Sequence, residues 1–311
     1  MSIHKQKKTI LISDPYFSIS NFYQYKKIKK MFKIKQNLTG KTLDRRKLKR
    51  LFISKNIIGV IAGLELYDEK LLNKIQNLRV ISRVGVGLDS INLQKCKQKK
   101  IKILKLNNEL SMSVAELSLT FILNSLRNVI DNNNLLKKNK WNPIIGKNLS
   151  NKTVGLIGYG KIGKILRKYL KIFDCNFLVF EKKKIKQSLK FKKTSLKEIF
   201  KKCDIISLNI DLNKSTHFLI NKKNLNISKK DLILINTSRG AIINEKDLFN
   251  FLQKNKKAKA FLDCFINEPY KGNLLKLNNC YMTPHIATFT TETRNKMELA
   301  CSKKLINFLR K

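Results

Sequence analysis

Three residues with complementary chemistry each stand just after a short apolar run. Arg239 follows LILINTS, Glu268 follows FLDCFIN and His285 follows CYMTP. The carboxyl ends of parallel strands form the edge at which open α/β sheets bind ligands. There an arginine can clamp a carboxylate, a histidine can supply a carbonyl proton, and a glutamate can favour the charged imidazolium. The set suits hydride exchange with a 2-oxo acid, although spacing alone leaves open that each is an ordinary hydrogen-bonded residue.

A glycine-rich turn, GYGKIG at 158–163, follows the apolar run TVGLI and opens an amphipathic pattern. In such a turn Gly158 allows the tight bend, Gly160 lets the backbone approach a pyrophosphate, and Gly163 lets the helix pack on the strand. A second run, NFLVF, ends in Glu181, 18 residues beyond the last glycine, where an acid accepts hydrogen bonds from ribose hydroxyls. This context predicts a dinucleotide site, against the alternative of glycines that only tighten a turn.

The residues around Glu181 bear on which dinucleotide binds. Its carboxylate favours NAD, because a 2′-phosphate would meet a like charge. Lys182, Lys183 and Lys184 follow directly and could pair with such a phosphate, unless they belong to the general lysine excess. We expect NAD as the cofactor and leave NADP open.

The elements that must position these residues follow from hydrophobic patterning. Four β-branched runs, TILIS, NIIGVIAG, LRVISRVG and IKILKL, alternate with Lys-rich helical spacing and predict one α/β unit over 1–106. Residues 111–140 read as one long helix. Six further runs, from TVGLIG to CYMTP, read as buried parallel strands of a doubly wound unit over 107–286. A last helical segment, 291–311, remains outside both.

Composition bounds the function without naming it. The chain has 311 residues and a net charge of +45, carried by 56 lysines and only 10 arginines. A nucleic-acid surface would favour Arg, so we attribute the charge mainly to compositional drift and expect no nucleic-acid partner. The six cysteines show no disulfide or metal-ligand spacing, and no apolar run reaches the length of a membrane span. We expect a cytoplasmic protein with no metal and no membrane contact.

Six segments recur in the order and approximate spacing of a known family. They are SRVGVGLDSIN (82–92), SVAEL (113–117), TVGLIGYGKIG (153–163), NTSRGAIIN (236–244), DCFINEP (263–269) and TPHIA (283–287). With them the chain resembles the D-isomer-specific 2-hydroxyacid dehydrogenases of the phosphoglycerate dehydrogenase type. The resemblance implies two doubly wound parallel-sheet domains of the Rossmann or flavodoxin kind. One is a discontinuous substrate domain, 1–106 plus 287–311, and the other an NAD-binding domain, 107–286.

The resemblance also implies roles for matching residues. Arg239 matches the substrate-binding arginine, Glu268 its supporting glutamate and His285 the proton donor and acceptor. On the cofactor side it implies that Lys161 and Ile162 bind the pyrophosphate through their amides and that Glu181 binds the ribose. At the nicotinamide it implies that Asp263 holds the carboxamide and that Thr237 and Ser238 line the pocket. The loop of Val84, Gly85, Val86 and Gly87 matches the one whose amides receive the substrate carboxylate.

Some positions depart from the family pattern. Glu181 stands where the family usually has Asp, which is a conservative change for ribose binding. The stretch 106–116 lacks the usual proline and is shortened. Members specific for phosphoglycerate often carry an arginine in the segment that is IAGLELYD (61–68) here, and this chain has none.

These observations predict an NAD-dependent oxidoreductase that interconverts a D-2-hydroxy acid and its 2-oxo acid, such as the glycerate/hydroxypyruvate or 3-phosphoglycerate pair. The chain ends after the final helical pattern, so we expect no regulatory domain. The resemblance further implies a homodimer, with the apolar helix 114–126 as a candidate contact. An NAD-sensing protein on the same fold, without turnover, is the alternative from another class.

Overall fold

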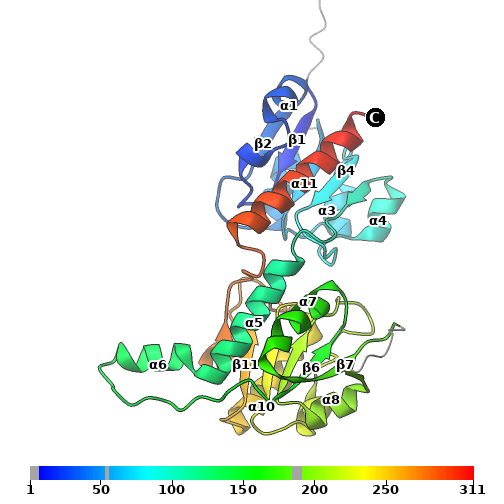
Figure 1. Ribbon diagram of the computed structural model, residues 1–311. Coiled ribbons are helices and arrows are strands. Elements are labelled where there is room, and N and C mark those ends of the chain that lie inside the picture. Colours follow the sequence, from blue (N-terminus) through cyan, green and yellow to red (C-terminus); the bar gives the residue numbers. More distant parts are fainter. Residues whose placement is uncertain (1–6, 53–55, 184–190) are drawn as a thin grey trace, which may run out of the picture. The chain divides into compact units, whose positions relative to one another are not determined.

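The computed structural model describes residues 7–52, 56–183 and 191–311, which form two compact units (Figure 1). The first unit comprises Met1–Leu110 and Thr290–Lys311, and the second comprises Ser111–Phe289. The domain boundaries predicted from the sequence, 106/107 and 286/287, lie three or four residues before these divisions.

The first unit is built on a five-stranded parallel sheet in the order β2-β1-β3-β4-β5. This is the flavodoxin-like order, in which the chain reverses its direction of winding beside β1. Its strands are β1 (Thr9–Ile12), β2 (Lys33–Gln36), β3 (Ile57–Ala62), β4 (Val80–Arg83) and β5 (Lys102–Leu104). Its α-helices are α1 (Tyr25–Met31), α2 (Arg45–Phe52), α3 (Glu69–Asn73), α4 (Leu93–Gln98) and α11 (Thr291–Leu309), with a 3₁₀ turn at Ile19–Asn21.

The last helix, α11, belongs to the first sheet although the whole second unit precedes it in sequence (Figure 1). A Cβ built on Gly59 of β3 would lie 3.2 Å from Leu309 Cδ1, so the missing side chain lets the helix approach closely. Ser82 of β4 donates its hydroxyl to the carbonyl of Cys301, 3.0 Å away. Met297, Cys301, Leu305 and Ile306 are buried along the helix. The discontinuous first domain that the resemblance implies is therefore confirmed.

The second unit contains a seven-stranded parallel sheet in the order β12-β11-β10-β9-β6-β7-β8. The order reverses between β6 and β9, which is the switch point where doubly wound sheets bind ligands. The strands are β6 (Thr153–Ile157), β7 (Asn176–Phe180), β8 (Lys192–Lys193), β9 (Ile205–Leu208), β10 (Ile233–Asn236), β11 (Lys259–Leu262) and β12 (Cys280–Met282). The helices are α5 (Ser111–Arg127), α6 (Val129–Leu136), α7 (Lys161–Leu170), α8 (Leu196–Lys202), α9 (Lys222–Asn226) and α10 (Glu245–Lys254), with 3₁₀ turns at Lys171–Phe173, Gly240–Ile242 and Asn273–Lys276.

The predicted fold class is confirmed, but three details of the prediction are wrong. The single helix expected over 111–140 breaks at Asn128, whose φ of 53° is left-handed. Its side chain holds that conformation by donating to the carbonyl of Ile145, 3.0 Å away, and accepting from Lys259. The strands β2 and β8 were not predicted, because KIKQ and KK lack the apolar character that marks a buried strand.

In the described part of the chain no helix is long and apolar enough to cross a membrane. None of the six cysteines, all of which lie in the described part of the chain, forms a disulfide, and five of them are buried.

Candidate active site

A histidine and a glutamate of the second unit lie in hydrogen-bond contact. Nδ1 of His285 lies 2.9 Å from Oε2 and 3.1 Å from Oε1 of Glu268, and each side chain is about a quarter exposed. Burial raises the pKa of Glu268, but the hydrogen bond and charge of His285, the Phe265 amide and the Arg239 charge together lower it below its usual value. A carboxylate can only accept, so Nδ1 carries the proton and Nε2 remains for the substrate.

A buried aspartate fixes the turn that carries this histidine. Asp263, 1% exposed at the end of β11, accepts from the Thr283 hydroxyl at 2.6 Å and from the amides of Ile286 and Ala287 at 2.7 and 2.9 Å. Burial raises the pKa of this carboxyl and outweighs the three hydrogen bonds that oppose the shift. His285 itself has a left-handed φ of 56°. The structure thus gives Asp263 a role in orienting His285, while its predicted contact with nicotinamide stays a prediction.

Arg239 begins the turn after β10, close to the segment that carries Glu268. Its Nη1 donates to the carbonyl of Ser238 at 2.7 Å, and the side chain is half-buried. The next residue, Gly240, packs so tightly that a Cβ there would clash with the backbone of Phe265. The close approach of these two loops brings Arg239, Glu268 and His285 to one end of the sheet, as predicted from their positions after β10, β11 and β12.

The turn after β10 is held by side chains that point back into the protein. Asn236, fully buried, donates to the Arg239 carbonyl and accepts from the Ser238 amide, both at 3.0 Å. The Thr237 hydroxyl lies 2.9 Å from that of Ser118 on α5, and the Ser238 hydroxyl donates to Leu208 at 2.6 Å. Asn236 and Gly240 were not predicted as site residues. The sequence feature that could have identified them is that they directly flank the predicted site residues Thr237, Ser238 and Arg239.

Close contacts explain two of the three glycines in the turn between β6 and α7. Gly158 has a φ of 94°, and a Cβ there would clash with the Asn209 carbonyl. A Cβ on Gly163 would lie 2.5 Å from the carbonyl of Gly158, so helix and turn meet without a side chain between them. A Cβ on Gly160 would meet nothing within 4 Å. Open space therefore lies beside the residue that caps the N-terminus of α7.

The adenosine end of the predicted cofactor site has a fixed carboxylate. Glu181, just after β7, accepts from the amides of Tyr159 at 2.9 Å and Lys183 at 3.0 Å. Burial raises its pKa, but hydrogen bonds from the amides of Lys183, Tyr159 and Lys182 and the Lys183 charge lower it on balance. Lys182 donates to the Ser215 hydroxyl at 2.8 Å. Lys184 lies outside the described residues.

These residues fit a dinucleotide. The first amides of α7, including those of Lys161 and Ile162, have no acceptor within their own helix and lie at its positive end. The space beside Gly160 leaves room for a pyrophosphate there. The ionised Glu181 lies at the neighbouring strand end, where it can accept from ribose hydroxyls.

The predicted carboxylate-binding loop, 84–87, belongs to the first unit and follows β4. The amide of Val84 donates to the Ala62 carbonyl at 2.9 Å, and the Gly85 carbonyl accepts from the Leu106 amide at 3.1 Å. Arg83 is 5% exposed and donates to the Val84 carbonyl at 2.7 Å, and its guanidinium lies 3.2 Å from a Cβ built on Gly85. The loop therefore rests on a buried cation that was not predicted from the sequence.

A buried acid stands at the same edge of the first sheet. Glu65 is 1% exposed and accepts from the Ser13 hydroxyl at 3.2 Å, and that hydroxyl lies 3.0 Å from the one of Tyr67. Burial, reinforced by the charge of Asp14 and opposed by Arg83, raises the pKa of Glu65 to about 7. Glu65 was not predicted as a site residue. The sequence feature that could have identified it is an acidic residue inside the otherwise apolar stretch IAGLELY.

Comparison with known proteins agrees with this geometry. Residues 119–287 match the model of the D-isomer specific 2-hydroxyacid dehydrogenase NAD-binding domain. A hydroxypyruvate reductase of Thermotoga maritima is 31% identical over 285 residues, which cover 90% of this chain and 93% of that protein. A D-3-phosphoglycerate dehydrogenase of Methanocaldococcus jannaschii is 32% identical over 246 residues, which cover 77% of this chain and 47% of that protein.

A similar fold is seen in a D-lactate dehydrogenase of Aquifex aeolicus that was solved with NAD and lactic acid. It superposes with a TM-score of 0.85 at 26% identity and covers 97% of this chain and 96% of its own. The family indicated by the six sequence segments is thereby confirmed. The chain belongs to the D-isomer-specific 2-hydroxyacid dehydrogenases and is an NAD-binding oxidoreductase.

Proposed function

We propose that this chain reduces a small 2-oxo acid to the D-2-hydroxy acid, and catalyses the reverse, with Arg239, Glu268 and His285 as its catalytic residues. The observation that carries the proposal is the pair of Glu268 and His285, 2.9 Å apart, beside the guanidinium-bearing turn of Arg239. When bound, the nicotinamide supplies or accepts the hydride.

Each residue has a defined part in this scheme. Arg239 holds the substrate carboxylate and stabilises the charge that develops on the carbonyl oxygen. His285 donates a proton from Nε2 to that oxygen during reduction and takes it back during oxidation. Glu268 accepts the Nδ1 proton throughout, which fixes the tautomer and stabilises the imidazolium. In the loop 84–87 the amides of Val86 and Gly87 are the ones proposed for the substrate carboxylate, because those of Val84 and Gly85 donate to the carbonyls of Ala62 and Arg83, both at 2.9 Å.

The substrate class we favour is unphosphorylated, as in glyoxylate or hydroxypyruvate. The segment IAGLELYD places the buried acid Glu65, and no cation, after β3. A phosphate dianion therefore finds no cation in this segment, and the buried Arg83 at the same edge already donates to the Val84 carbonyl at 2.7 Å. The Thermotoga maritima relative, which is matched over 93% of its length, is named hydroxypyruvate reductase, and this supports the choice of an unphosphorylated substrate.

For the cofactor we propose NAD(H) over NADP(H). The ionised Glu181 would repel a 2′-phosphate, and the nearby Lys182 already donates to Ser215. Gly158, Gly160 and Gly163 shape the turn, and Thr237, Ser238 and Asp263 stand at the nicotinamide end in this proposal.

We also propose a homodimer, on a surface other than the predicted helix 114–126. The apolar side chains of that helix, such as Val114, Phe121 and Ile122, are buried within the second unit. In contrast α6 and the segment after it project from this unit (Figure 1) with Leu136 54%, Trp141 84% and Ile145 92% exposed. A second copy that covers these side chains would remove them from water.

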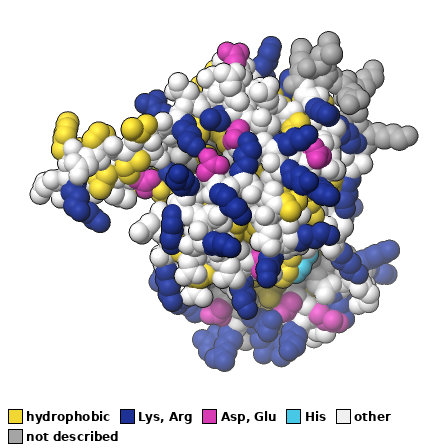
Figure 2. Space-filling model, turned by 90° about the horizontal axis from the view of Figure 1, so that it is seen from below, with side chains coloured by type: hydrophobic (Ala, Val, Ile, Leu, Met, Phe, Trp, Pro, Cys, Tyr) yellow, Lys and Arg dark blue, Asp and Glu magenta, His cyan; other side chains and the backbone are white. Residues whose placement is uncertain are grey.

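No nucleic-acid or membrane partner is part of the proposal. On the face seen in Figure 2, Lys and Arg side chains are scattered among other residues and do not form one continuous basic stripe. A cytoplasmic location fits six cysteines that all remain thiols.

An NADH-oxidation panel tests the proposal. It includes glyoxylate, hydroxypyruvate, pyruvate, branched 2-oxo acids and phosphohydroxypyruvate, each repeated with NADPH. We expect the highest kcat/KM with NADH and an unphosphorylated acid. Tight NADH binding with no turnover on any 2-oxo acid would overturn the proposal in favour of an NAD-sensing protein, and the highest kcat/KM with phosphohydroxypyruvate would overturn the choice of substrate.

A further inference from the structure

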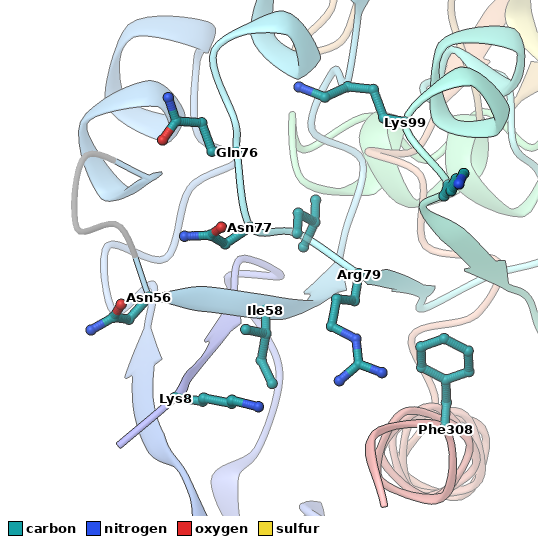
Figure 3. A pocket seen from close by; sticks show the side chains of 10 residues that line it. Lys8, Asn56, Ile58, Gln76, Asn77, Arg79, Lys99 and Phe308 are labelled. Atoms are coloured by element: carbon teal, nitrogen blue, oxygen red, sulfur yellow. The ribbon is translucent and has the colours of Figure 1, made fainter. Parts of the chain in front are cut away.

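A cavity lies in the first unit, at the opposite edge of its sheet from the loop 84–87. Its volume is about 650 Å³, within the usual range of small-molecule sites. Lys8, Asn56 and Arg79, which line it, immediately precede β1, β3 and β4 (Figure 3). The loop 84–87 follows the carboxyl end of β4, so this cavity is separate from that loop.

The lining has one sign of charge. Of its ten described residues four are cationic, three are side-chain amides, three are apolar and none is acidic. The carboxylates of the neighbouring helices are engaged elsewhere: Glu69 pairs with Lys95 at 3.2 Å, and Asp68 pairs with Arg45. Like charges gathered around one concave surface raise the local potential and attract an anion.

One of the four cations has an ordinary structural role. Lys99 donates from Nζ to the carbonyls of Leu72 and Ile75, 2.6 and 2.5 Å away, and so caps the backbone where α3 ends. That explanation does not extend to Lys8, Arg79 or Lys100. Among the described residues, none forms a hydrogen bond or ion pair with their side chains.

Arg79 is the best-placed of these three cations. Its backbone is fixed in the sheet, because its amide donates to Ile58 at 2.9 Å and its carbonyl accepts from Lys102 at 2.8 Å. Its guanidinium lies 5.9 Å from the ring centroid of Phe308, which restricts the side chain further. Figure 3 shows the amino group of Lys8 pointing toward the guanidinium of Arg79, beneath Ile58. The two donors can therefore share one anion.

We propose that this pocket binds a small phosphate ester, with its phosphate held between Lys8 and Arg79. A guanidinium fork and an ammonium group match a dianion with three acceptor oxygens. The apolar surface of Ile58 and Phe308 lies beside the two donors, and the amides of Gln76 and Asn77 lie further along the cavity, where they can bind hydroxyl groups (Figure 3). A long basic stripe would suit a nucleic-acid backbone, but a pocket of about 650 Å³ suits a small molecule.

Thermal unfolding of the full chain tests the proposal. The probes are glycerol 2-phosphate and inorganic phosphate, each compared with NaCl at equal ionic strength. The double variant Lys8→Ala/Arg79→Ala is compared with Lys29→Ala/Lys30→Ala, which removes the same charge from the exposed surface of α1 in the same unit. We expect both phosphates to raise the Tm of the wild type and of the α1 variant, and to leave that of the pocket variant unchanged.

A conservative variant and a polyanion sharpen the test. Arg79→Lys keeps the charge but loses the fork, so its affinity for glycerol 2-phosphate in calorimetry should fall about tenfold. NADH turnover should be unchanged in all these variants. The proposal is overturned if NaCl stabilises as much as phosphate, if the pocket and α1 variants respond alike, or if duplex DNA competes at 0.15 M salt and the pocket variant loses DNA binding.

Discussion

Replacing Glu65 by Gln should remove a large pH dependence from the stability of the first unit. The wild-type carboxyl is 1% exposed, and its Oε1 has no hydrogen-bond partner in the described structure. Burial, together with the charge of Asp14, raises its pKa from 4.5 to about 7, although Arg83 and the Ser13 hydroxyl oppose the shift. The folded protein therefore holds this proton more tightly than the unfolded chain does.

The sign and size of the effect follow from that difference. The stabilising contribution of the protonated carboxyl is fully present below pH 4.5 and is lost as pH rises through 7. A shift from 4.5 to about 7 corresponds to about 3 kcal/mol of unfolding free energy. Gln cannot ionise. Its own cost, about 1–3 kcal/mol if one amide atom stays unpaired, does not change with pH.

Urea denaturation followed by circular dichroism at pH 5, 7 and 9 measures this difference. Relative to wild type, the Glu65→Gln variant should gain about 3 kcal/mol between pH 5 and pH 9. Glu69→Gln serves as the control, because Glu69 lies on the following helix α3 with its side chain 60% exposed. It should follow the wild-type curve closely. Parallel curves for wild type and Glu65→Gln would refute the assignment of a raised pKa to this buried carboxyl.

Three further predictions concern the second unit. His285→Ala and Arg239→Ala should each lower kcat/KM by about 10³-fold while NADH binding, measured by fluorescence, stays within a few-fold of wild type; full activity in either contradicts their roles. Glu268→Gln should lower kcat/KM about 10²-fold, since an amide holds the Nδ1 proton and the ring orientation less firmly than a carboxylate, and unchanged kinetics would argue against the pair. Glu181→Gln should raise the NADPH to NADH ratio of kcat/KM about tenfold, and an unaltered ratio would show that Glu181 does not select the cofactor.

A strand could be predicted from the sequence where its burial requires a run of apolar residues. β3, read as IIGVIA, is buried at every residue and shows in the sequence as an apolar run. β2, KIKQ, has no fully buried residue and is indistinguishable from the lysine-rich segments around it. The break at Asn128 could not be predicted, because it depends on bonds to Ile145 and Lys259, which are distant in sequence.

The grouping of the three proposed catalytic residues was predictable for a topological reason. Residues just after parallel strands lie at the same edge of the sheet whatever the details of packing. The sequence alone therefore predicts that Arg239, Glu268 and His285 lie at one edge. The direction of a side chain is a different matter. Asp263 also follows a strand, yet its carboxylate faces inward and holds the turn before Ala287. Only the packing of that turn decides this.

The net charge of +45 arises mainly from lysines at the surface, whereas the acids discussed above are held inside the protein or by backbone amides. Cations at the surface need no partner, because water and salt screen them, so their number can drift without cost to the fold. A buried acid needs specific donors. Glu298, 1% exposed, accepts from Arg294 at 2.6 Å and from the Ser18 amide at 3.0 Å, and Glu181 and Asp263 depend on backbone amides in the same way. Total charge therefore bears on the salt dependence of weak binding, whereas the chemistry follows from the few acids that are held in place.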